Sequence, residues 1–448
     1  CLRYSLNTQL IEKDIPVLSL EKEIVPEHLL RRRNSTTVLK HRRTQAYLKS
    51  FKKKPALLFY KVSSKIEEIC KRNNWIMIAN PKRYGKETIE NKVKFRKIQE
   101  ECGISPIPGE ATDFFKLDFK ELANKYGLPF VIQHPTKGGG KGTFFIEDEE
   151  DFENLKIEKG DQFKETEVIV AKFVEGPSPS LTGCVTRYGI VYTNLQYQLL
   201  DIPELFSPEK GSGLFCGHDW TASDFSKELS EQAYSYTRKI GEYFKKIGYQ
   251  GIFGLDMVVD KKTDQLYVVE CNPRLLGSFP VLPMVQIRNN EIPLLALHIL
   301  EFLKADYEID VQEINQMVQQ KKQGAQMIMH NLEGVPAKTT LELKAGVYKI
   351  KNNKLIYQRA GYALRHLIDK EEFLITDGVP QKGSRYSKNG RIMRILTLSK
   401  VLDDYKKLSP WAKNVAATIY RSLGLKPQTI WERLRPRNIL RKIYKRLI

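Results

Sequence analysis

Residues 269–274 read Val-Glu-Cys-Asn-Pro-Arg and end an apolar run. Successive side chains of a strand point to opposite faces, so Glu270, Asn272 and Arg274 are predicted to share one face. A carboxylate, an amide and a guanidinium on one face indicate a polar site at the end of a buried strand.

A second carboxylate, Asp256, lies in the preceding strand-like segment, before a turn at residues 260–264. Together with Glu270 and Asn272 it supplies the oxygen ligands that Mg²⁺ (or Mn²⁺) prefers when it binds with a polyphosphate. Arg274 can contact a phosphate or a carboxylate with both arms of its guanidinium. The alternative is a surface ladder of ion pairs, which the apolar residues before Glu270 disfavour.

A glycine-rich loop is the other strong signal. Residues 131–143 read Val-Ile-Gln-His-Pro-Thr-Lys-Gly-Gly-Gly-Lys-Gly-Thr. Consecutive glycines let backbone N–H groups approach phosphate oxygens, and Lys137 and Lys141 add positive charge. The spacing matches neither a P-loop nor a dinucleotide-binding fingerprint. From these residues alone, phosphate binding and a flexible hairpin tip are equally good interpretations.

The first hundred residues indicate a parallel α/β layer. Apolar runs at residues 15–18, 56–60 and 75–79 are typical of strands, and segments of helical period at 63–73 and 89–102 follow the second and third runs. Strands that alternate with helices in this way form parallel sheets. The chain lacks an initiator Met, which suggests that this layer is truncated or processed.

Beyond this layer, strand and helix patterns alternate up to about residue 310, and short β segments follow. Residues 181–200 are predicted to form a hairpin. Residues 277–287 are predicted to be irregular. A second cluster of glycines between 211 and 217 predicts a loop, with His218 and Asp219 immediately after it as either ligand contacts or ordinary loop residues.

Length and charge narrow the function classes. The 448 residues suggest about three domains, and 41% hydrophobic residues fit a globular chain. Most of the net charge of +20 lies near the ends, because residues 31–54 carry ten basic and no acidic side chains and residues 426–448 carry eight basic and one acidic. The nearly balanced body disfavours a protein that follows a nucleic-acid backbone.

Cellular location is predicted from three features. No apolar run reaches the roughly 20 residues of a membrane span, and no signal peptide begins the chain. Six scattered cysteines without a C-x-x-C pair suit reduced thiols. The expectation is a cytoplasmic protein. Its basic amphipathic tail is expected first to dock on the protein itself, second to contact an anionic membrane surface, and least of all to bind nucleic acid.

The glycine loop and the Glu-Cys-Asn-Pro-Arg strand, in this order and about 130 residues apart, resemble those of the ATP-grasp superfamily. Its biotin-carboxylase-like and carboxylate–amine ligase branches look most similar. The resemblance covers residues 56–303 and implies an α/β fold in which two lobes enclose ATP. The implied divisions are an N-terminal α/β domain (1–103), a small lobe (104–175), a large lobe with the metal site (176–310), a β-rich C-terminal module (311–425) and the basic tail (426–448).

The resemblance also implies roles for single residues. Nucleotide contacts fall on a lysine, a strand residue, the glycine loop and a hinge: Lys92, Gln133, Lys137, Gly138, Gly139, Gly140, Lys141, Gly142, Ala171, Lys172, Phe173 and Val174. The family's Mg²⁺ ligands correspond to Asp256, Glu270 and Asn272. Its catalytic residue, which contacts the transferred phosphoryl group, corresponds to Arg274. Gln196 and Gln198 alternate along a strand where they could face the ligand.

Three departures from the family pattern stand out. Gln133 replaces a lysine that usually precedes the glycine loop, and Ala171 replaces an acidic residue at the start of the hinge. Residues 275–280 read Leu-Leu-Gly-Ser-Phe-Pro, which lacks the Gln-Val-Glu-His run of biotin carboxylases. Biotin carboxylase activity is therefore disfavoured.

The implied function is ATP- and Mg²⁺-dependent, ADP-forming ligation, in which a small-molecule carboxylate is activated as an acylphosphate and captured by an amine. Two alternatives stay open. One is a nucleotide-binding adaptor with degenerate ATP-grasp lobes, which its basic ends recruit to an anionic membrane or nucleic acid. The other is a phosphotransferase that uses the same lobes.

Overall fold

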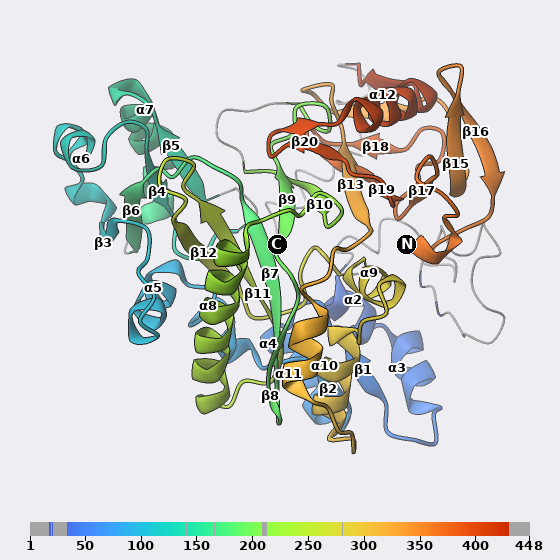
Figure 1. The fold of residues 1–448 in the computed structure, drawn as a ribbon, viewed down its shortest axis with the longest axis horizontal. Coiled ribbons are helices and arrows are strands. Elements are labelled where there is room, and N and C mark those ends of the chain that lie inside the picture. Colours follow the sequence, from blue (N-terminus) through green and yellow to red (C-terminus); the bar gives the residue numbers. More distant parts are fainter. Residues whose placement is uncertain are drawn as a thin grey trace. The chain divides into compact units, whose positions relative to one another are not determined.

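The computed structural model describes residues 18, 20, 34–138, 142–164, 166–207, 213–279 and 281–429. The chain divides into two compact units. The larger unit comprises Glu12–Leu200 and Lys210–Gln323, and the smaller unit comprises Cys1–Ile11, Asp201–Glu209 and Gly324–Ile448. Both units mix helices with strands, as Figure 1 shows.

The larger unit begins with an α/β layer. Strands β1 (Ala56–Leu58) and β2 (Ile76–Ile78) pair in parallel, and helix α4 (Ser64–Arg72) connects them. Helices α2 (Ser35–Lys40) and α3 (Arg42–Lys49) precede this pair. The predicted parallel layer is therefore confirmed for residues 56–78. The apolar run at residues 15–18 lies, except for residue 18, outside the described residues.

A four-stranded antiparallel sheet follows, in the order β3-β6-β4-β5. Its elements are β3 (Gly109–Asp113), α6 (Phe119–Tyr126), β4 (Phe130–Gln133), β5 (Thr143–Ile146), α7 (Glu149–Lys159) and β6 (Glu167–Lys172). Fully buried phenylalanines, among them Phe130, Phe152 and Phe163, form the core between this sheet and its helices. Helix α5 (Lys92–Glu101) connects the α/β layer to this sheet. The strands on either side of the glycine loop are thus confirmed.

The large sheet of this unit has the order β12-β11-β7-β9-β10, with β8 paired to β7. Its strands are β7 (Pro179–Thr186), β8 (Gly189–Tyr192), β9 (Gln196–Leu200), β10 (Phe215–Asp219), β11 (Gly251–Val259) and β12 (Leu266–Asn272). Helix α8 (Lys227–Lys246) runs alongside this sheet (Figure 1) and packs Tyr234, Ile240 and Phe244 into its core. The sheet places the ends of β11 and β12 side by side.

The structure corrects three local predictions. Residues 282–288 form helix α9 (Leu282–Arg288), where Pro283 sits in the first turn and its missing N–H breaks no helical bond. Residues 215–217 of the predicted loop at 211–217 belong to β10, in which a β-bulge accommodates Gly217 at φ +140°. The predicted hairpin contains a third strand, β9, which pairs with the start of β7.

Two helices end the larger unit, α10 (Leu294–Leu303) and α11 (Val311–Met317). Gly251, at φ +76°, lies directly against His298 of α10. A Cβ at this glycine would lie 2.2 Å from the His298 Nδ1 atom. Only glycine therefore allows β11 to begin here with α10 packed against it.

The smaller unit is rich in strands, as predicted for the C-terminal part of the chain. Its main sheet has the order β13-β19-β17-β15-β16, from β13 (Ala325–His330), β15 (Gly346–Lys351), β16 (Lys354–Arg359), β17 (Phe373–Thr376) and β19 (Arg391–Thr397). Shorter strands are β14 (Ala337–Thr339), β18 (Arg385–Tyr386), β20 (Leu402–Asp404), β21 (Lys407–Leu408) and β22 (Leu425–Pro427). Helix α12 (Pro410–Leu423) was not predicted. The tail beyond residue 429 lies outside the described residues.

His330 makes the smaller unit sensitive to acid. Burial, and secondarily Arg391, lower the pKa of His330 to about 4, against opposing effects of the Leu205 and Ile328 backbone groups. The unfolded chain binds a proton at about pH 6.5 and the folded chain only near pH 4, so stability falls as the pH drops between these values. From pH 7 to pH 5 we expect a loss of about 2 kcal/mol from this residue. Urea unfolding of the wild type and of His330→Gln at both pH values measures it; equal losses in the two proteins would contradict the assignment.

In the part of the chain that the structure describes, no helix is both long enough and apolar enough to cross a bilayer. Cys70, Cys102, Cys184, Cys216 and Cys271 are free thiols. Four of them are buried, and Cys102 is half-buried.

Candidate active site

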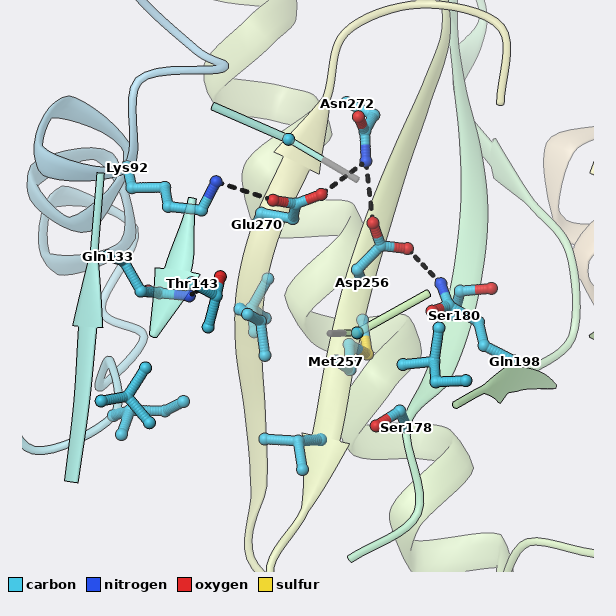
Figure 2. Close-up of a pocket in the computed structure, with 18 of the residues that line it drawn as sticks. Lys92, Gln133, Thr143, Ser178, Ser180, Gln198, Asp256, Met257, Glu270 and Asn272 are labelled. Atoms are coloured by element: carbon cyan, nitrogen blue, oxygen red, sulfur yellow. Dashed lines mark hydrogen bonds and ion pairs between the residues drawn. The ribbon is translucent and has the colours of Figure 1, made fainter. Parts of the chain in front are cut away.

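The carboxylates Asp256 and Glu270 face each other across the pair β11–β12, where they are direct cross-strand neighbours. The Asn272 Nδ2 atom donates to Asp256 Oδ2 at 2.8 Å and to Glu270 Oε1 at 3.4 Å (Figure 2). Gln198 on β9 donates to the other oxygen of Asp256. The structure thus brings the three predicted metal ligands together. Among the described residues no group of three or more His, Cys, Asp or Glu side chains could hold a metal ion.

Lys92 holds Glu270 from the opposite side. Its Nζ atom lies 2.9 Å from Glu270 Oε2 and donates to the carbonyl of Lys137 at 3.2 Å. Asn91 caps α5 by accepting from two backbone N–H groups of the first turn, and the Lys92 N–H donates to the Pro135 carbonyl. The start of α5 is therefore attached to the glycine loop, which fixes Lys92 between that loop and β12.

The two carboxylates have opposite electrostatic surroundings. Burial, and then the Glu270 carboxylate, raise the pKa of Asp256 to about 7. Burial also acts to raise the pKa of Glu270, but the charge and hydrogen bond of Lys92 outweigh it and leave that pKa below its usual value. The two half-buried carboxylates supply oxygen ligands of the kind a hard divalent cation prefers, and the Asn272 amide lies between them with its oxygen turned to Arg274. The residues present therefore fit Mg²⁺.

Arg274 lies just beyond the end of β12 and is held on all sides. Its Nε donates to Glu90 Oε1 at 2.8 Å, and one terminal nitrogen donates to Asn272 Oδ1 at 2.6 Å. The other terminal nitrogen donates to the hydroxyl of Tyr60 at 3.1 Å and to the Leu275 carbonyl at 3.2 Å. The guanidinium is thus fixed beside the candidate metal site before any ligand binds.

A cavity of about 440 Å³ extends from this site between the small and large sheets of the larger unit. Its size is that of a small-molecule site. Apolar walls come from both sheets: Val131, Ile169 and Ala171 on one side, Met257 and Val268 on the other. The predicted hinge residues Lys172, Phe173 and Val174 line it as well. A flat heterocycle and a chain of phosphates would both find matching surfaces here.

The glycine loop borders the same cavity. Gln133 Nε2 donates to the Thr143 hydroxyl at 3.3 Å across β4–β5 (Figure 2), and Lys137 contacts Gln162. Lys137 and Gly138 line the cavity, whereas Gly142 does not. A Cβ on Gly142 would lie 2.5 Å from the Lys137 Cβ atom, so this glycine serves the loop's own turn. Gly139, Gly140 and Lys141 lie outside the described residues.

Several cavity residues had no sequence signal. Glu90 and Tyr60 accept hydrogen bonds from Arg274, although they precede it by 184 and 214 residues in the chain. Arg96 donates to the carbonyls of Ile107 and Gly109 and so fixes the entry into β3. His218, expected as either a ligand contact or an ordinary loop residue, is buried on β10 and lines the cavity.

Gln196 and Gln198 were both expected to be able to face the ligand. Gln198 lines the cavity and donates to Asp256. Gln196 is fully buried and bonds instead to Ser180 and Trp220. Its side chain is therefore structural.

Residues 89–278 match the family model described as the ATP-grasp domain. The butirosin acyl-carrier protein–L-glutamate ligase of Niallia circulans is 24% identical over 267 residues, which are 56% of this chain and 60% of that ligase. The chain therefore spans less than two thirds of this curated relative.

Two solved structures share the fold. A biotin carboxylase from Campylobacter jejuni in a β-γ-ATP complex superimposes with a TM-score of 0.56 at 16% identity, covering 82% of this chain and 76% of that one. The biotin carboxylase domain of the Hydrogenobacter thermophilus 2-oxoglutarate carboxylase, in complex with MgADP, ADP and bicarbonate, gives 0.51 at 15% identity, covering 75% and 67%. At these identities the likeness concerns the fold.

Proposed function

We propose that this chain, whose residues 89–278 form an ATP-grasp domain, is an ATP-dependent, ADP-forming ligase that joins a carboxylate to an amine. The observation that carries the proposal is the contiguous arrangement of Asp256, Glu270, Asn272, Lys92 and Arg274 at one end of a nucleotide-sized cavity. The relative in Niallia circulans, a ligase by its name, supports the reaction class.

Asp256, Glu270 and Asn272 would hold Mg²⁺. The ion would neutralise charge on the β- and γ-phosphates of ATP during transfer. Lys92 and Lys137 would add positive charge from the side of the glycine loop. The apolar walls from β4, β6, β11 and β12 would enclose the adenine, with residues 172–174 along its edge.

The reaction would have two steps. A carboxylate oxygen attacks the γ-phosphorus, the bond to the β-phosphate oxygen breaks, and ADP leaves. The amine nitrogen then attacks the acyl carbon, inorganic phosphate leaves, and the nitrogen loses a proton. Positioning and charge stabilisation carry both steps, so neither requires a nucleophilic side chain.

Arg274 would steady the carboxylate or the transferred phosphoryl group, since its planar fork matches both anions. Closure of the glycine loop over ATP would exclude water and protect the acylphosphate. The attachment of Lys92 to that loop through the Lys137 carbonyl supports this coupling, because a movement of the loop moves a cation next to Glu270.

Two other functions remain as alternatives. The adaptor hypothesis draws on the two basic ends, of which residues 34–54 and 426–429 are described, and no comparison supports it. A phosphotransferase would use the same residues but stop after the first step.

The test of the proposal is ADP and phosphate release from Mg·ATP with carboxylates and amines added in pairs. Carboxylate-dependent ADP formation with an amide product supports a ligase, and a stable phosphorylated product would instead support a phosphotransferase. ATP binding without turnover across a broad panel would count against both.

Gln133 offers a gain-of-function test. It lines the cavity where the related pattern has a lysine, and a lysine there would add a cation facing the phosphates. We expect Gln133→Lys to bind ATP more tightly, by up to about tenfold. Equilibrium titration of both proteins with Mg·ATP measures this. Gln320→Lys, exposed and outside the cavity, is the control for added charge alone; an equal gain in both variants would refute a local contact.

A further inference from the structure

A second cavity, about 200 Å³ in volume, adjoins the candidate active site. Tyr60 and Arg274 line both cavities. The second cavity is bounded by residues 59–64 and 79–86 of the N-terminal layer and by residues 273–275 after β12. One arginine and one tyrosine therefore border both spaces.

The rim of the second cavity is basic. Lys61, Lys82, Lys86 and Arg274 line it, and Glu90 is the one acidic residue among its lining. Glu90 already contacts Lys61 at 3.0 Å and Arg274 at 2.8 Å. One carboxylate shared by two cations leaves an excess of positive charge, which favours an anionic ligand.

Helix α4 begins at this rim. Its cap Ser63 and its first residue Ser64 both line the cavity. The Ser63 hydroxyl accepts from the Ile66 N–H at 3.4 Å. The N–H groups of Ser64 and Lys65 belong to the first turn, where a helix supplies no acceptor. They add to the attraction for an anion.

The floor is apolar except for one histidine. Phe59, Ile252 and Leu275 line it and are at most 7% exposed. His298 is 3% exposed, and its Nδ1 accepts from the Ile252 N–H at 3.1 Å. Its Nε2 has no hydrogen-bond partner. The Ile78 backbone interacts with the imidazole and opposes the lowering of the His298 pKa by burial. One histidine thus interrupts an otherwise apolar floor.

We propose that the second cavity binds the carboxylic acid substrate, a small acid whose carboxylate lies at Arg274 and the basic rim and whose apolar body packs on Phe59, Ile252 and Leu275. This inference rests on the proposed ligase function. The volume limits the ligand, because one water takes about 30 Å³ and the cavity therefore holds about seven water volumes. Acids of roughly that many heavy atoms fit, and large ones do not.

The test places a thiol at the rim and uses butyrate as the probe. In the full-length chain with Mg·ATP, Ser64→Cys is labelled with an anionic and with a cationic methanethiosulfonate, and site-specific labelling is read by mass spectrometry. Thr263→Cys, exposed, outside both cavities and flanked by two lysines and two aspartates, is the control. We expect the anionic-to-cationic rate ratio to be higher at Ser64→Cys by about threefold or more. The ratio cancels any general rise in thiol reactivity at a helix start.

Butyrate should slow labelling of Ser64→Cys about threefold at twice its dissociation constant, the result for simple competition. Sodium chloride at equal ionic strength and butylamine should not. Ala79→Leu, which fills the cavity, should abolish the protection, whereas Ala305→Leu, outside both cavities, should keep it. Absence of protection by butyrate, or protection by inorganic phosphate alone, would overturn the proposal.

The same samples separate this inference from the proposed function. Mg·ATP binding and ADP formation are measured on the wild type without any label. If ATP binds and turns over but butyrate gives no protection, only the second cavity has been misassigned. If butyrate protects but ATP does not bind, the ligase function fails while an anion cavity remains, and the cavity is then not a substrate site.

Discussion

Glu270→Gln is expected to reduce ATP turnover by about 10²–10³-fold while the protein stays folded. The substitution keeps the shape of the side chain and the hydrogen bond to Asn272 but removes a full negative charge. Of the two carboxylates at the site, only that of Asp256 would then remain. A divalent ion held by one carboxylate and two amides binds more weakly.

The measurement is ADP release at saturating Mg²⁺, together with a magnesium titration that should move to higher concentration. Glu242→Gln, an exposed glutamate of α8, is the matched control and should retain full activity. Glu270→Gln also leaves Lys92, which is 7% exposed, without its ionic partner. If thermal unfolding shows a loss of stability, the double variant Lys92→Gln/Glu270→Gln separates that loss from metal binding. Unchanged turnover in Glu270→Gln would refute the metal assignment.

The metal candidates could be predicted from the sequence because their arrangement is local. Glu270 and Asn272 are two residues apart on one strand, and a short turn connects that strand to the one that carries Asp256. Strand alternation and antiparallel pairing then bring all three side chains to one face. The register of β11–β12, with Asp256 opposite Glu270, confirms this reasoning.

The residues that support the site could not be predicted in the same way. Glu90 and Tyr60 contact Arg274 only after the N-terminal layer has packed beside the end of β12. Such contacts depend on how two separately formed layers meet, and no periodicity in the sequence encodes that. Met257 and Val268 read simply as core residues, because an apolar wall of a cavity and a packed core use the same side chains.

Local structure was predicted well where apolar periodicity was regular and poorly where glycine and proline dominated. The segments predicted at 56–60, 63–73 and 75–79 contain β1, α4 and β2. Gly217 suggested a loop but lies in a strand, because a bulge accepts the positive φ that glycine allows. Proline 283 suggested irregular structure but begins a helix.

Arg274→Lys is expected to lower the turnover number by about 10²-fold, with the dissociation constant for ATP changed by no more than about twofold. Lysine keeps the positive charge but has one nitrogen. The guanidinium donates to Glu90, Asn272, Tyr60 and the Leu275 carbonyl from three nitrogens. These contacts use four of the five guanidinium N–H groups and leave one for a carboxylate or a phosphoryl group, whereas a lysine ammonium has only three N–H groups in all.

Steady-state kinetics with varied carboxylate, together with direct titration of ATP, separate the possible outcomes. Arg72→Lys, on the exposed face of α4, is the conservative control and should behave as wild type. If Arg274 contributed only its positive charge, Arg274→Lys would keep its activity, since lysine is also a cation. A large loss in turnover with ATP affinity preserved would therefore show that the planar geometry held by Glu90 and Asn272 is what the reaction requires. Wild-type kinetics in Arg274→Lys would instead reduce Arg274 to a general source of positive charge.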